Sequence, residues 1–96
     1  ENMAWFTPSE LPNNKYFIFG QGGCKNLAND LNVPLLGQIP LVQSVCEGGD
    51  NGTPAVLNIE SPAGEALMIA AANLAQQVAI RNATLEPTRS VQTNAY

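Results

Sequence analysis

The sequence predicts an α/β fold built from two or three short strands and two or three helices. Short apolar runs rich in aromatic and β-branched residues alternate along the chain with segments of helical periodicity. Two such runs are too few to make a parallel sheet that is covered on both faces. The pattern therefore indicates the last third of a larger α/β domain.

The first half is predicted to be a strand, a helix and a second strand. Tyr16–Phe19 is aromatic and β-branched, which favours a short buried strand. Apolar residues at positions i, i+3, i+4 and i+7 from Cys24 to Leu31 predict an amphipathic helix, which Pro34 cannot continue. Leu35–Leu41 is almost continuously apolar and favours a strand that is buried on both sides.

The second half is predicted to be mainly helical. A short helix is expected over 42–47, before a glycine-rich loop over 48–54 and a short extended segment. Ser61 is a good N-cap and Pro62 suits the first helical position, so the main helix is expected to begin there. We expect this helix to end near Asn82.

We divide the chain into a folded part, residues 1–82, and a tail, residues 83–96. The tail has few large apolar side chains and no periodicity, so it is expected to be mobile.

Composition excludes several classes of function. The chain has 96 residues and a net charge of −4, and its four basic residues are well apart, which argues against nucleic-acid binding. It contains no histidine, which excludes His-based triads and His-ligated zinc. No apolar run approaches the roughly 20 residues of a membrane helix, and no signal-peptide pattern is visible. A cytoplasmic location away from membranes is expected.

Two glycine-rich turns are the candidate sites for chemistry. Gly20–Gly23 lies where phosphate loops occur, but Lys25 replaces the third glycine of GxGxxG, and Cys24 replaces the glycine before the lysine of GxxxxGK[ST]. A tight turn is the favoured interpretation, with phosphate binding as the alternative. In the loop Gly48–Gly52 only Asp50 is placed as an oxygen ligand, so no metal site is expected.

The remaining chemical groups suggest no catalytic residue. Cys24 and Cys46 are interpreted as buried small apolar residues, with one disulfide between them left open. Trp5 and Phe6 are interpreted as core, with a pocket or interface lining as the alternative. No paired carboxylates are apparent, and a Ser–Lys dyad stays open.

Three stretches carry a family resemblance in their order and spacing. They are Glu1–Met3, then Tyr16–Gly20 followed by Leu27–Ala28, and Val33–Leu41 followed by Glu47–Val56. These "ENM", "YxIFG", "VPLLGxIPL" and "GDxGxPxV" pieces together resemble the C-terminal part of the Mrp (ApbC-like) P-loop ATPases. Those proteins are iron–sulfur cluster carriers related to the MinD group, and the resemblance covers residues 1–80.

The resemblance implies a nucleotide site that is shared between two parts of a polypeptide. In this family the phosphate loop and the magnesium ligands lie in the N-terminal part, so this chain alone is expected not to hydrolyse ATP. The C-terminal part supplies the wall beside the base. There Asn2 matches the Asn that hydrogen-bonds adenine, and Pro40 and Leu41 match the backbone beside the base. An Asn amide offers both the donor and the acceptor that an adenine edge requires.

The resemblance also implies partners. They are the N-terminal ATPase half, a second copy in a homodimer, and iron–sulfur apo-proteins. Family members that carry a cluster have a CxxC between "ENM" and "YxIFG", whereas Thr7–Pro12 contains no cysteine, so the usual cluster ligands are not expected here. The alternative function is a free-standing, non-catalytic interaction module. A domain cut from its other half exposes apolar sheet and helix faces, so self-association of the isolated fragment is expected.

Overall fold

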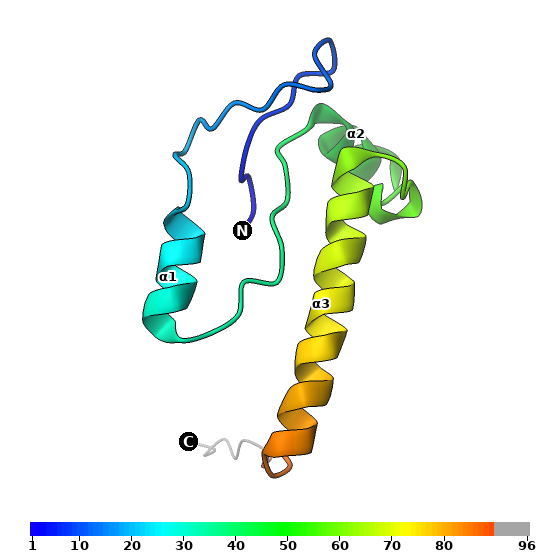
Figure 1. Ribbon diagram of the computed structural model, residues 1–96. Coiled ribbons are helices and arrows are strands. Elements are labelled where there is room, and N and C mark those ends of the chain that lie inside the picture. Colours follow the sequence, from blue (N-terminus) through cyan, green and yellow to red (C-terminus); the bar gives the residue numbers. More distant parts are fainter. Residues whose placement is uncertain (90–96) are drawn as a thin grey trace, which may run out of the picture.

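The computed structural model describes residues 1–89, and its regular elements are helical (Figure 1). The helix α1 spans Gly23–Leu31, α2 spans Gln43–Asn51 and α3 spans Pro62–Thr84. A 3₁₀ turn, η1, spans Ala55–Leu57. Figure 1 shows α1 and α3 on opposite sides of the extended segments that carry the N-terminus and the link to α2.

The predicted α/β fold with a parallel sheet is wrong. Residues 1–89 contain no strand, and their only β pairings are two isolated bridges, in which Phe6 pairs antiparallel with Tyr16 and parallel with Leu41. The expected strand at 16–19 turns instead, because the Gly20 N–H donates to the Phe17 carbonyl at 3.2 Å. The expected strand at 35–41 has one pairing partner and includes a proline, which lacks the N–H that a ladder needs.

Two extended segments nevertheless run side by side. The N–H of Ala4 donates to Ile39 O at 3.0 Å, and the N–H of Leu41 donates to Trp5 O at 2.7 Å. The N–H of Thr7 then donates to Leu41 O at 3.2 Å. These hydrogen bonds place residues 4–7 along residues 39–41, and we call these two stretches the paired segments.

The predicted first helix is confirmed as α1. Gly22 precedes it at φ 83°, and Asn32 closes it at φ 55°, where its N–H meets the carbonyls of the last turn. Within the apolar stripe only Ala28 is buried, while Leu27 and Leu31 stay exposed. The helix therefore forms as expected, but most of its apolar stripe has no cover.

The predicted short helix forms and is longer than expected. α2 continues through two glycines to Asn51 and ends at Gly52, whose φ of 72° suits the left-handed closure of a helix. The Thr53 N–H completes this closure by donating to Gly48 O at 2.8 Å. The expected extended segment at 55–57 is the 3₁₀ turn η1.

The predicted main helix is confirmed as α3. Ser61 Oγ accepts the Gly64 N–H at 3.0 Å, which is the expected N-cap, and Pro62 occupies the first turn. The helix ends at Thr84, two residues beyond the expected Asn82. In the predicted tail, residues 85–89 are irregular, and residues 90–96 lie outside the described residues.

A few close contacts join α3 to the rest of the chain. Asn73 Nδ2 donates to Leu36 O at 2.7 Å, and a Cβ built on Gly37 would lie 3.1 Å from the Ala70 Cβ. The buried side chains of the described core are small, and Thr7 is its one buried polar residue; the apolar ones are Ala4, Ala28, Pro40 and Ala63. The chain therefore has a thin core for its length.

Neither cysteine side chain is fully buried, and no described helix suits a bilayer. Both cysteines are free, Cys24 is half-buried and Cys46 is exposed, so the prediction that both are buried is wrong and the alternative of a disulfide is not realised. Among residues 1–89, no helix combines the length and hydropathy needed to cross a bilayer.

Candidate functional site

The turn at Asn2 and Met3 is held at both ends by one residue. The Ile39 N–H donates to Glu1 O at 2.8 Å, and Ile39 O accepts the Ala4 N–H at 3.0 Å. Met3 lies between them at φ 53°, a left-handed conformation that is uncommon for a residue with a side chain. The two clamps therefore fix a strained turn at the start of the paired segments.

The side chain of Asn2 is partly committed within this turn. Its Oδ1 accepts the Met3 N–H at 2.9 Å. Within the described part of the chain its Nδ2 donates to no protein group, and the residue is exposed. A carbonyl oxygen has two lone pairs, so Asn2 still offers one acceptor and two donors to a ligand, in a fixed orientation.

The other two predicted site residues lie on the neighbouring segment. Leu41 is held by the hydrogen bonds of its N–H and carbonyl to Trp5 and Thr7, and its side chain is 38% exposed. Pro40 is buried. The structure thus places Asn2 in the turn before one paired segment, and Pro40 and Leu41 on the other, directly after the residue that clamps the Asn2 turn. Of the two, Leu41 has the accessible side chain.

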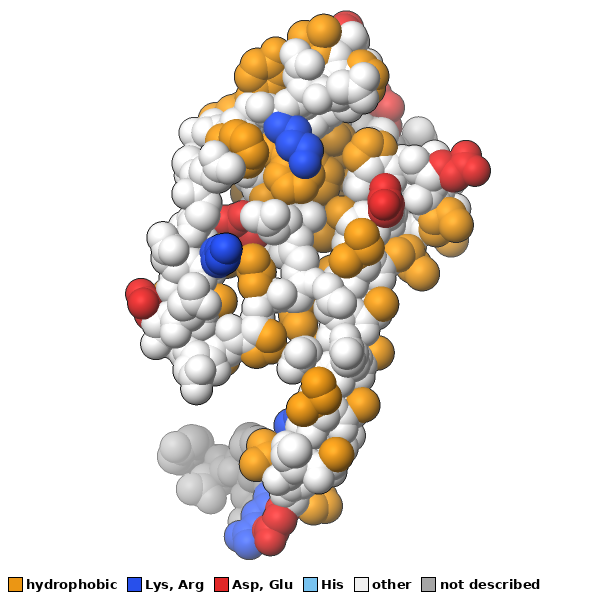
Figure 2. All heavy atoms as spheres, in the orientation of Figure 1, with side chains coloured by type: hydrophobic (Ala, Val, Ile, Leu, Met, Phe, Trp, Pro, Cys, Tyr) orange, Lys and Arg blue, Asp and Glu red, His pale blue; other side chains and the backbone are white. Residues whose placement is uncertain are grey.

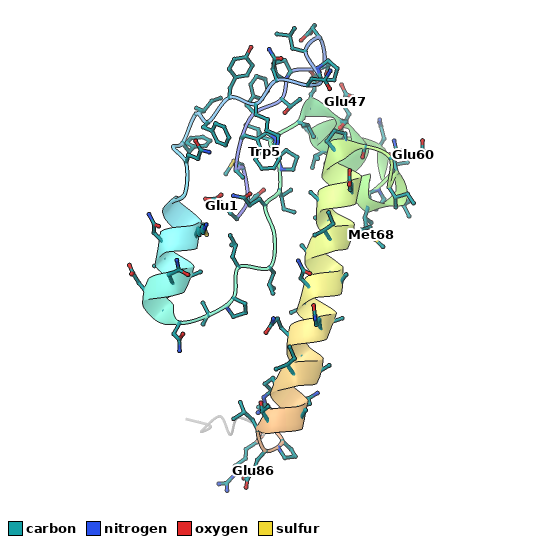
Figure 3. All side chains as sticks on the ribbon, in the orientation of Figure 1. Glu1, Trp5, Glu47, Glu60, Met68 and Glu86 are labelled. Atoms are coloured by element: carbon teal, nitrogen blue, oxygen red, sulfur yellow. The ribbon has the colours of Figure 1, made fainter. Side chains whose placement is uncertain are left out.

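An aromatic cluster adjoins the paired segments, and sequence reasoning missed how it is organised. Trp5 meets Phe17 edge to face, with ring centroids 6.5 Å apart, and Phe6 lies 6.5 Å from Tyr16. Lys15 Nζ lies 4.1 Å from the centroid of the Trp5 ring, within the range of a cation–π interaction. Trp5 and Phe6 are half-buried, which lies between the predicted core and the alternative lining. Figure 3 shows Trp5 in this upper part of the molecule.

The first glycine-rich turn is a structural turn, as favoured. Gly20 and Gly22 both have positive φ, 88° and 83°, and Gly22 directly precedes α1. Such angles suit glycine because it has no Cβ. The turn therefore redirects the chain from the aromatic cluster into α1.

A hollow of about 400 Å³ lies between α2, η1 and the start of α3. Glu47 and Asn51 line it from α2, and Asn58 and Ser61 line it from the approach to α3. Figure 3 shows Glu47 and Glu60 in this region, at the end of the molecule where α2 meets α3. The lining carries one carboxylate and no cationic side chain, so it does not suit a phosphate group.

The thiols and carboxylates of the described residues are not grouped to fit an iron–sulfur cluster or a metal ion. The loop that follows Thr7 is closed by backbone hydrogen bonds and by Thr7 Oγ1, which donates to Asn14 O at 2.9 Å, and it contains no thiol. Cys24 and Cys46 lie on separate helices. Among residues 1–89, no three His, Cys, Asp or Glu side chains are grouped to hold a metal.

Comparison with known proteins gives a consistent family match. The family model described as ParA, NUBPL iron-transfer P-loop NTPase, matches residues 1–79, which include all three predicted site residues. An iron–sulfur cluster carrier protein from Synechocystis is 43% identical over 81 residues, which cover 83% of this chain and 23% of the relative. One from Deinococcus radiodurans is 42% identical over 82 residues, which cover 84% of this chain and 23% of the relative.

A plant protein shows a similar match. The iron–sulfur protein required for NADH dehydrogenase, mitochondrial, from Arabidopsis thaliana is 40% identical over 78 residues. This match covers 81% of the present chain and 24% of that protein. The chain thus spans about a quarter of the length of these relatives.

Proposed function

The chain belongs to the family of NUBPL iron-transfer P-loop NTPases, and from this membership we propose that it is a segment of an ATP-binding, ATP-hydrolysing iron–sulfur cluster carrier. In that carrier it forms the wall beside the adenine base and part of the dimer surface. The observation that carries the proposal is the turn at Asn2, which both backbone groups of Ile39 hold in place and which exposes the Asn2 side-chain amide. This turn lies within the residues that the family model matches.

The geometry of Asn2 supports recognition of adenine. An adenine edge presents a ring-nitrogen acceptor beside an amino donor. Asn2 Nδ2 donates to the ring nitrogen, and the second lone pair of Oδ1 accepts from the amino group. The corresponding edge of guanine presents two acceptors, N7 and O6, so Oδ1 would face an oxygen. To present a donor to that oxygen, the amide of Asn2 would have to turn over, which would break the hydrogen bond from the Met3 N–H to Asn2 Oδ1. The geometry therefore favours adenine over guanine.

The neighbouring segment provides an apolar surface for the face of the base. The side chain of Leu41 is 38% exposed two residues after Ile39, which clamps the Asn2 turn, and buried Pro40 lies between these two residues. An exposed leucine held by two backbone hydrogen bonds is a rigid contact for a flat ring. In this arrangement Asn2 selects the base and Leu41 packs against it.

The remaining chemistry belongs to other parts of the longer protein. Among the described residues the turn at 20–23 has no phosphate-loop sequence, and Lys15 is engaged over Trp5. We therefore assign the triphosphate, its magnesium ion and the hydrolytic water to the part of the carrier that this chain does not span. The cluster is cargo, and we assign no cluster ligand to this segment because its two thiols lie on separate helices.

The test is nucleotide affinity of the longer carrier protein with Asn2→Ala. Losing one or two hydrogen bonds of about 1 kcal/mol each is expected to weaken ATP binding roughly 5- to 30-fold, with a much smaller effect on GTP. Isothermal titration with ATP and GTP measures both. Asn13→Ala, in the exposed loop, is the matched control and is expected to leave both affinities unchanged. An unaltered preference for ATP in Asn2→Ala would refute the assigned role.

A further inference from the structure

The hydrogen bonds of Ile39 enclose one more residue than a regular parallel pairing does. In a regular pairing, the N–H and the carbonyl of one residue bond to two residues that are two positions apart on the neighbouring chain. The Ile39 N–H donates to Glu1 O at 2.8 Å, and Ile39 O accepts the Ala4 N–H at 3.0 Å, and these partners are three positions apart. The turn at Asn2 and Met3 therefore contains an extra residue, as in a β-bulge, a feature that is frequent next to active sites.

Pairing on both sides of the turn fixes the position of this extra residue. Before the turn, the Glu1 nitrogen donates to Gly37 O at 2.8 Å, and the Glu1 carboxylate accepts from Gln38 Nε2 at 3.1 Å. After the turn, the Leu41 N–H donates to Trp5 O at 2.7 Å. Figure 1 shows the N-terminal segment beside the extended link that leads to α2. A slip of the chain would break hydrogen bonds on one side or the other, so the extra residue is confined to the turn.

The extra residue changes which backbone N–H is free beside Asn2. In a regular pairing the Ile39 carbonyl would accept the N–H of Met3, which is two positions after Glu1. In the structure this carbonyl accepts the Ala4 N–H, and the Met3 N–H donates to Asn2 Oδ1 at 2.9 Å instead. The extra residue thus releases a backbone donor, and that donor holds the side-chain amide next to it.

The conformation of Met3 is not explained by packing of its own side chain. Its φ of 53° is costly for a residue with a Cβ, and its side chain is 44% exposed. The hydrogen bonds around the turn therefore maintain the left-handed conformation. A strained backbone that the surrounding structure maintains indicates a functional role.

We propose that Met3 is a positioning residue for the selection of the base. Its N–H holds Oδ1 of Asn2, so Nδ2 faces the ligand as a donor in a fixed position. ATP and GTP carry the same charge, and Figure 2 shows few basic side chains on the visible face, so charge does not distinguish these nucleotides. The orientation of one amide decides between the acceptor and donor of adenine and the two acceptors of guanine. The inference rests on the proposed function in taking Asn2 to meet the base.

The first test uses the longer carrier without nucleotide. Hydrogen exchange of single backbone amides, followed by NMR, is expected to be about 5-fold slower at the Met3 N–H in the wild type than in Asn2→Ala, because the substitution removes its acceptor. The Ala4 N–H, which is bound to Ile39, is the matched control and is expected to stay equally protected in both proteins. Equal exchange at Met3 in the two proteins would overturn the proposal.

The second test is deletion of Met3 in the longer carrier. The deletion leaves Ala4 two positions after Glu1, so both hydrogen bonds of Ile39 can form in a regular pairing. The melting temperature is expected to change by less than about 3 °C. The preference for ATP over GTP, measured by isothermal titration, is expected to fall about 5- to 30-fold. Deletion of Asn13, in the exposed loop, is the matched control and is expected to keep the preference.

The outcomes separate the role of Met3 from that of Asn2. If Asn2→Ala loses the preference for ATP and the Met3 deletion keeps it, Asn2 selects the base without the extra residue; the role of Met3 is then overturned, and the proposed function stands. If neither variant alters the preference, both roles are refuted. If the deletion variant does not fold, the exchange rate of the Met3 N–H decides, because that measurement requires no deletion.

Discussion

Gly64 is a position in α3 where adding a single methyl group is expected to lower the stability of the fold. Its backbone packs against the turn before the helix, so that a Cβ would overlap the Asn58 carbonyl oxygen and lie 2.8 Å from Ala55 O. Both obstacles are backbone atoms, which cannot rotate aside as a side chain can. The Gly64 N–H also donates to the N-cap Ser61 Oγ, so moving the helix away would stretch this hydrogen bond.

The expected cost of Gly64→Ala can be worked from these contacts. Alanine in a helix interior gains up to about 1 kcal/mol over glycine, whereas overpacking against rigid neighbours costs about 1–3 kcal/mol, and damage to an N-cap costs about 1 kcal/mol more. The free energy of unfolding is therefore expected to fall by about 1–3 kcal/mol. Urea unfolding followed by circular dichroism at 222 nm reports it, because α3 is the longest helix described.

Gly49→Ala is the matched control for this experiment. Gly49 lies within α2, and a Cβ there meets no atom within 4 Å. Without a clash, only the helix preference remains, so this variant is expected to be stabilised by about 0.5–1 kcal/mol. If Gly64→Ala were stabilised to the same degree, the close approach between α3 and the Asn58 turn would be refuted.

Three other substitutions follow from single contacts. Ser61→Ala removes the cap of α3 and is expected to lower stability by about 1 kcal/mol, while Ser61→Asp restores it; urea unfolding compares them. Asn73→Ala leaves the Leu36 carbonyl without its hydrogen-bond partner at 2.7 Å and is expected to lower the free energy of unfolding by about 1–2 kcal/mol. Equal stability of Asn73→Ala and wild type would contradict this. Lys15→Met removes the cation above Trp5, the one tryptophan of the chain. It is expected to shift the tryptophan fluorescence and to lower the free energy of unfolding by about 0.5–1 kcal/mol. Lys15→Arg keeps the cation and is expected to leave both quantities close to wild type.

The helices were predictable because their signals are local. The stripe from Cys24 to Leu31 and the Ser61–Pro62 start each lie within a few residues, and both gave helices where expected. Helix ends were less accurate, as at α2, where glycine was interpreted as a loop residue although Gly48 and Gly49 lie within the helix.

The strands were not predictable because their formation depends on distant partners. Aromatic and β-branched residues fit a half-buried pleated surface, and they form strands only where neighbouring chains provide one. Tyr16–Phe19 pairs at a single residue, and the segment before Leu41 includes a proline that cannot donate. The sequence therefore marks residues that are able to form strands, but not whether a neighbouring strand lies within reach of them.

The candidate site was predictable only in part. Asn2, Pro40 and Leu41 were identified by resemblance to a family, and the family match covers all three. The clamp by Ile39 and the position of Lys15 over Trp5 join residues that are far apart in the chain or lack any motif, so no sequence signal marked them.

The two backbone hydrogen bonds of Ile39 prevent the Asn2 turn from moving independently of Ile39. Both of its ends are fastened to the backbone of one residue, through the N–H on one side and the carbonyl on the other. A displacement of Ile39 would therefore carry the amide of Asn2 with it as a rigid body. Because main-chain atoms make both fastenings, many side chains could replace isoleucine there, but proline could not.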